Sequence, residues 1–139
     1  MRVLDTNVFI RFLTGDDPAK ASASRALFQA MDRGEQDLFA SEAVVAEIIY
    51  VLTSKKHYGL SRVDATDRLR PALAVRGLHM SEKLAAISAL DIFVTYPFLD
   101  FEDALSVAHA RAQTTNEVVS YDRGFSRVDG ISRIEPSPA

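Results

Sequence analysis

The chain has 139 residues, of which 47% are hydrophobic and 25% are charged, and it contains no cysteine. This length suits one core, so we expect a single domain over residues 1–139. The lack of cysteine excludes disulfides and thiolate metal sites and fits a reducing cytoplasm. Asp5 interrupts any signal-peptide core and no later run is long and apolar enough for a membrane span, so we expect a cytoplasmic protein. The net charge of −3 gives no indication of a nucleic-acid partner.

The first half of the chain alternates short apolar runs with helical periodicities. In chain order we expect a strand at 3–4, a helix ending at 15, a helix over 17–34, a strand at 38–39, and helices that begin at 41 and 61. Asp17 and Pro18 suit the N-cap and first position of the second helix. Pro71 should kink the fourth helix or end it near Arg70.

The second half continues the same alternation. We expect a strand at 78–80, a helix from 81 that ends before 97, a helix capped by Asp100, a strand at 117–121 and an edge strand around 131–134. Strands that alternate with helices indicate an α/β domain. The predicted fold is a mostly parallel central sheet of about four to five strands, flanked by helices.

Two acidic residues directly follow predicted strands. Asp5 closes the first strand, and Asp122 follows the strand at 117–121. In open parallel sheets, ligands bind beyond the carboxyl ends of the strands, so both carboxylates are candidates for one site. The alternatives are a helix cap for Asp5 and an ordinary turn residue for Asp122.

Two further acidic residues lie on predicted helices. Glu47 interrupts a segment, residues 43–52, that is otherwise apolar on nearly every face, so we expect this helix to be buried. A buried carboxylate needs a cation, a basic side chain or a gap to solvent, and these alternatives stay open. Asp103 lies in the first turn after Asp100, where it either projects over the strand ends or complements the helix dipole.

These four acidic residues could converge on one crevice, because two follow strands, one lies on an apolar helix and one lies at a helix start. Such a site would offer oxygen ligands alone. The three histidines, His57, His79 and His109, are far apart in the sequence and do not suggest a zinc site. Oxygen ligands favour a hard cation, Mg²⁺ or Mn²⁺.

At these positions the sequence resembles the PIN-domain ribonucleases, and among them the VapC-type toxins of type II toxin–antitoxin systems. The resemblance covers essentially the whole chain and lies in four ordered motifs: Leu4-Asp5-Thr6-Asn7, Val45-Ala46-Glu47-Ile48, Phe101-Glu102-Asp103-Ala104-Leu105 and Val119-Ser120-Tyr121-Asp122-Arg123-Gly124-Phe125. It implies a PIN-like fold with a metal held by four residues: Asp5, Glu47, Asp103 and Asp122. It also implies that Asn7 and Ser120 orient these ligands or the scissile phosphate.

The resemblance further implies an activity and partners. The activity would be metal-dependent hydrolysis of RNA phosphodiester bonds, in which the cation activates a water molecule and stabilises the transition state. The protein would be a cytoplasmic homodimer, and a small VapB-type antitoxin would neutralise it by blocking the acidic crevice.

Other functions stay open at this point. The chain could be an RNA-processing PIN nuclease that is not a toxin, or a catalytically idle PIN domain that binds RNA or protein. A phosphotransfer domain with a nucleophilic aspartate is disfavoured. Haloacid-dehalogenase-like phosphatases need an acid where Asn7 stands, and response-regulator receivers need paired acids and a strand-end lysine that this sequence lacks.

Overall fold

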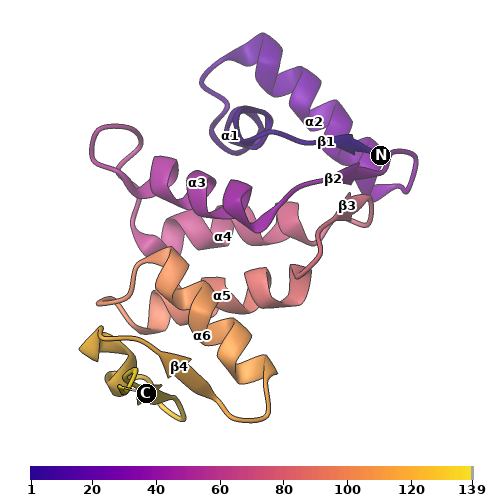
Figure 1. The fold of residues 1–139 in the computed structure, drawn as a ribbon. Helices are drawn as coiled ribbons and strands as arrows, with labels where there is room; N and C mark the ends of the chain where they lie inside the picture. The colour runs from indigo at the N-terminus through magenta and orange to yellow at the C-terminus, as the bar shows by residue number, and fades with distance from the viewer. Residues whose placement is uncertain (139) are drawn as a thin grey trace. The chain divides into compact units, whose positions relative to one another are not determined.

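The computed structural model describes residues 1–138 (Figure 1). The chain divides into two compact units, the first over Met1–Lys83 and the second beginning at Leu84. Each unit contains its own parallel sheet. Among residues 1–138, no helix combines the length and the apolar character that crossing a bilayer would require.

The first unit is built on a three-stranded parallel sheet in the order β1 (Arg2–Val3), β2 (Leu38–Phe39) and β3 (Leu78–His79). Val3 lies opposite Phe39, which lies opposite His79. The N–H of Leu4 donates to the Phe39 carbonyl oxygen at 2.7 Å and extends this pairing towards Asp5. Because the strands are parallel, their carboxyl ends share one edge of the sheet, and Asp5 lies at that edge.

Four helices join these strands, as parallel pairing requires. They are α1 (Thr6–Thr14), α2 (Pro18–Asp32), α3 (Glu42–Thr53) and α4 (Arg62–Leu73). Asp17 caps α2 by accepting the Lys20 N–H at 3.1 Å, as the sequence predicts. Gly15 ends α1 in the left-handed region, with φ +68°, where glycine has no Cβ to strain.

Pro71 lies inside α4, which continues to Leu73. Termination near Arg70, one of the two predicted outcomes, therefore does not occur. Proline removes one N–H from a helix, but here it stands in the last turn, where a single backbone bond is lost. Ala72 and Leu73 are buried and hold this turn against the core.

Gly77 precedes β3 at a point where the backbone has no room for a side chain. A Cβ here would overlap the Gln36 carbonyl oxygen and lie 2.9 Å from the Met31 carbonyl oxygen. The N–H of Gly77 donates to the Met31 carbonyl oxygen at 2.9 Å, and its own carbonyl oxygen accepts from the Leu38 N–H at 2.9 Å. This glycine therefore ties the end of α2 to the start of the sheet.

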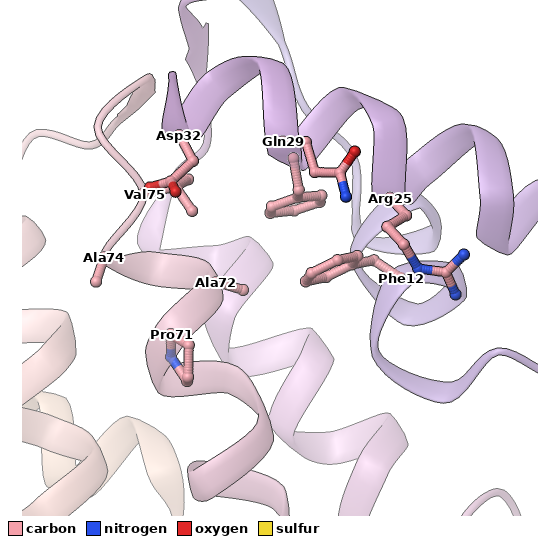
Figure 2. Close-up of a pocket in the computed structure, with 9 residues that line it drawn as sticks. Phe12, Arg25, Gln29, Asp32, Pro71, Ala72, Ala74 and Val75 are labelled. Atoms are coloured by element: carbon pink, nitrogen blue, oxygen red, sulfur yellow. The ribbon is translucent and has the colours of Figure 1, made fainter. Parts of the chain in front are cut away.

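A pocket of about 480 Å³ in the first unit is lined by α1, α2 and the end of α4 (Figure 2). The rings of Phe12 and Phe28 stack beneath it with centroids 4.2 Å apart. Figure 2 shows Arg25 and Asp32 at its two ends. None of the predicted site residues lines this pocket.

The second unit contains most of α5 (Lys83–Thr95), together with α6 (Phe101–Ala112), β4 (Glu117–Val119), the 3-10 helix η1 (Arg123–Arg127) and β5 (Ser132–Ile134). β4 and β5 pair in parallel, with Val119 opposite Ile134. Phe93 of α5 packs edge-on against Phe101 of α6, with ring centroids 5.7 Å apart, and both rings are buried.

The α/β class and the parallel pairing are confirmed. The described residues form five strands, as predicted, but these belong to two sheets of three and two strands rather than to one central sheet. Each strand spans only two or three residues, because the sequence turns to helix or loop directly after each short apolar run.

Candidate functional site

Asp5 lies at the carboxyl end of β1, directly before α1. It occupies the N-cap position with extended backbone angles, φ −92° and ψ 159°, yet its side chain makes no capping hydrogen bond. The residue is exposed. The cap interpretation therefore does not account for this carboxylate, which stays available to a ligand at the sheet edge.

Glu47 reaches the same part of the first unit from α3. Its Oε2 accepts a hydrogen bond from the hydroxyl of Thr6 at 2.9 Å. Thr6 is only 4% exposed and follows Asp5 directly, at the start of α1. A buried hydroxyl thus fixes the position of Glu47 next to the strand end that carries Asp5.

The prediction that the Glu47 helix is buried on all sides is wrong. Ala43, Glu47 and Tyr50 are all exposed, and they share one stripe of α3. The opposite side, which includes Ile48 and Leu52, is fully buried. The apolar composition misled the prediction because alanine and tyrosine occupy exposed positions without large cost. Glu47 therefore needs no buried ion pair.

In the second unit, Asp100 and Asp103 form a capping box at the start of α6. Asp100 Oδ1 accepts the Asp103 N–H at 2.7 Å, and Asp103 Oδ2 accepts the Asp100 N–H at 3.4 Å. Partial burial raises the pKa of the Asp103 carboxyl, and the negative charges of Asp100 and then Asp122 raise it further. Asp103 thus serves as a cap and lies within electrostatic reach of Asp122.

Asp122 follows β4 by three residues and begins η1. Its Oδ1 accepts the Gly124 N–H at 2.8 Å, and its own N–H donates to the Ser120 hydroxyl at 3.0 Å. Ser120 is held in turn, because its N–H donates to the Ile134 carbonyl oxygen at 2.9 Å. Arg133 donates to the Ser120 carbonyl oxygen at 3.1 Å. The backbone that carries Asp122 is therefore anchored to β5.

A family model for the PIN domain matches residues 2–131 and so spans all four acidic positions. The chain belongs to the PIN-domain family. This membership agrees with the α/β architecture and with the order in which the acidic residues follow the strands.

The PIN domain of this chain is similar in length and sequence to proteins named as ribonucleases. A VapC ribonuclease of Aquifex aeolicus is 26% identical over 136 residues, which cover 98% of this chain and 97% of that protein. Ribonuclease VapC13 of Mycobacterium tuberculosis is also 26% identical over 136 residues, which cover 96% of this chain and 99% of that protein.

Asn7 lies in the first turn of α1 and is exposed. It lines a pocket of about 260 Å³ between α1 and α2, together with Arg11 and Lys20. Asn7 is two residues from Asp5 in the chain. Its predicted role in orienting ligands or phosphate stays a prediction.

The predicted acids are divided between the two units. In the first unit Glu47 accepts a hydrogen bond from Thr6, the chain neighbour of Asp5. In the second unit Asp122 acts electrostatically on Asp103. Within residues 1–138, no three acidic or histidine side chains form a metal-binding group. The convergence of all four acids therefore stays a prediction.

Sequence reasoning missed Thr6. A small hydroxyl residue at the first position of a helix is a common and weak signal, and its partner lies 41 residues away. The one feature that pointed to Thr6 was its position directly after Asp5, the acidic residue that follows the first strand.

Proposed function

We propose that this PIN domain is a metal-dependent ribonuclease that hydrolyses RNA phosphodiester bonds with Asp5, Glu47, Asp103 and Asp122. The observation that carries the proposal is the absence of basic partners. None of these four carboxylates forms an ion pair with lysine, arginine or histidine anywhere in residues 1–138. A carboxylate without a basic partner leaves its charge to be balanced by a cation, and Asp103 also experiences the negative charge of Asp122.

The donor set fits Mg²⁺ or Mn²⁺. All four side chains offer carboxylate oxygens, the described residues contain no competing cysteine, and hard divalent cations prefer such ligands. A bound divalent cation would neutralise the acidic site and activate water for attack on the phosphate. The raised pKa of Asp103 also fits, because a neighbouring cation would relieve the repulsion that this carboxyl experiences.

The residues of the chain would prepare this site in three ways. The Thr6 hydroxyl would hold the Glu47 carboxylate in a fixed orientation. The Ser120 hydroxyl would hold the backbone of Asp122. The Asp100 N–H would hold the Asp103 carboxylate through its Oδ2.

We further propose that the two units act as one domain and that the protein is the toxin of a toxin–antitoxin pair. The names of the relatives and the ordered acidic motifs support this proposal. The protein would then act in the cytoplasm as a homodimer, and a VapB-type antitoxin would block the acidic residues. The alternatives are a PIN nuclease with an RNA-processing role and an idle domain that binds RNA or protein.

Cleavage of RNA by the purified protein tests the proposal. We expect cleavage with Mg²⁺ or Mn²⁺, none with excess EDTA, and recovery when Mn²⁺ is restored. Asp122→Asn should lose orders of magnitude in rate while its melting temperature shows that it is folded. Glu102→Gln is the matched control, since Glu102 is an exposed acid beside Asp103 that belongs to no predicted site. Full activity of a folded Asp122→Asn variant would overturn the mechanism.

A further inference from the structure

Phe98 is an aromatic residue that the core of the second unit does not use. It lies in the turn between α5 and α6 and is 38% exposed, whereas Phe93 and Phe101 on the two flanking helices are each 4% exposed. The guanidinium carbon of Arg127 lies 4.0 Å from the centroid of the Phe98 ring. Tyr96 contacts the ring edge-on at 5.8 Å between centroids. Phe98 and Arg127 thus form an exposed stack.

This stack stands beside one of the proposed metal ligands. A Cβ built on Gly124 would lie 3.1 Å from Asp122 Oδ1 and 3.6 Å from Cδ2 of Phe98. The carboxylate and the ring therefore approach the same point on η1. Tyr121, the chain neighbour of Asp122, is 70% exposed and adds a second aromatic side chain to this surface.

The turn that carries Phe98 is fixed to the loop after η1. The Tyr96 hydroxyl accepts the Asp129 N–H at 3.3 Å, and the Leu99 N–H closes the turn on the Tyr96 carbonyl oxygen at 3.0 Å. The stack is therefore preorganised, and a ligand would not have to order it.

Arg127 keeps its charge available for a ligand. Within residues 1–138 the Arg127 side chain forms no ion pair, and its guanidinium contacts the Phe98 ring. Aromatic rings and guanidinium planes are the groups on which proteins stack unpaired RNA bases, and the positive charge also attracts the phosphate backbone.

We infer that Phe98 and Arg127 form a stacking site for an unpaired RNA base next to the bond that is cleaved. The inference rests on the proposed function, and it specifies the substrate. RNA should be single-stranded at the nucleotide that meets this site, because a paired base inside a helix exposes no free face to the ring. Phe98 would provide the stacking surface, and Arg127 would provide both stacking and charge.

Binding of a short single-stranded RNA of mixed sequence tests this inference. The second probe is an abasic oligomer of the same length, which keeps the phosphate backbone but has no bases to stack. Both are titrated in Mg²⁺ into the Asp5→Asn protein, which prevents cleavage. Phe98→Leu should weaken binding of the normal RNA about 5- to 150-fold. It should leave binding of the abasic oligomer unchanged. Arg127→Gln should weaken binding of both probes, because it removes charge.

Two control variants keep the test decisive. Phe98→Trp retains an aromatic face and should bind the normal RNA at least as tightly as the parent protein, even if Phe98→Leu folds poorly. Arg33→Gln removes an arginine that is paired with Glu35 in the other unit, and it should leave both affinities unchanged.

Equal losses for both probes in Phe98→Leu, or no loss for either, would overturn the stacking site. Cleavage by the wild-type protein is measured separately on the same RNA. Base-dependent binding without cleavage would support the stacking site and overturn the proposed hydrolysis. If the wild-type protein cleaves the RNA and folded Phe98→Leu binds and cleaves it as the wild type does, the stacking site is overturned and the proposed hydrolysis stands.

Discussion

Replacing Thr6 with valine separates a role in holding the metal site from a role in folding. Thr6 is 4% exposed, and its hydroxyl donates to Glu47 Oε2 at 2.9 Å. Valine has nearly the same volume, so it should preserve the packing of α1. The change removes only the hydrogen bond that fixes the Glu47 carboxylate.

The expected effect on stability is small. A hydrogen bond to a charged group contributes about 1.5–3 kcal/mol. Glu47 is exposed, however, so water would solvate its carboxylate once the bond is lost. The new methyl group would add about 0.8 kcal/mol of hydrophobic stabilisation. We therefore expect the free energy of unfolding to fall by about 1 kcal/mol or less.

The expected effect on metal affinity is larger, because nothing replaces the lost orientation of the carboxylate. Removing a side chain that holds a metal ligand typically weakens metal binding about 10- to 100-fold. Calorimetric titration with Mn²⁺ measures this affinity, and melting curves in EDTA measure stability. Thr6→Ser keeps the hydroxyl and should bind Mn²⁺ nearly as the wild type does.

Two results would refute this reasoning. Wild-type Mn²⁺ affinity in Thr6→Val would mean that the hydrogen bond does not serve a metal site. A loss of several kcal/mol in stability with unchanged affinity would mean that the hydroxyl is structural.

Three further changes test other parts of the structure. Because burial and the neighbouring aspartates raise the pKa of Asp103, the native protein binds this proton more tightly than the unfolded chain does. In metal-free protein the stability that Asp103 contributes should therefore be lost as pH rises above 3.8. Asp103→Asn should melt at a higher temperature than wild type in EDTA at neutral pH. If the variant melts lower, the loss of the capping interaction outweighs the relief of charge repulsion. Hydrogen bonds from Tyr58 and other neighbours lower the pKa of Asp16, so this carboxylate contributes stability that is lost as pH falls below 3.8. Tyr58→Phe should make urea unfolding less dependent on pH in that range, and an unchanged pH profile would argue against the hydrogen bond. Gly77→Ala should lower the free energy of unfolding by about 1–3 kcal/mol, because the alanine Cβ would overlap the Gln36 carbonyl oxygen. An unchanged free energy of unfolding in denaturant melts would contradict the close approach of Gly77 to that oxygen.

Features that depend on neighbouring residues were predictable from the sequence. Asp17 and Asp100 cap helices as expected, because a cap joins a side chain to a backbone N–H three residues away. The strand ends at Asp5 and Asp122 were also close to their predicted places, because each follows a short apolar run.

Features that depend on packing between distant segments were not predictable. The hydrogen bond from Thr6 to Glu47 requires α1 to lie beside α3, and no local pattern encodes that placement. The exposure of Glu47 depends on which stripe of α3 meets the core, and composition alone does not identify that stripe. The sequence left open whether Asp103 is a cap or a site residue, and the capping box does not decide between them, since Asp122 also acts on this carboxyl.

We propose that Asp5 and Glu47 act with Asp103 and Asp122 on one metal ion. The most direct measurement is the single-turnover rate of RNA cleavage at saturating Mn²⁺ for Asp5→Asn, from the first unit, and Asp103→Asn, from the second. If all four acids act together, each folded variant should lose orders of magnitude in rate. A wild-type rate in either folded variant would show that its unit supplies no carboxylate to the reaction.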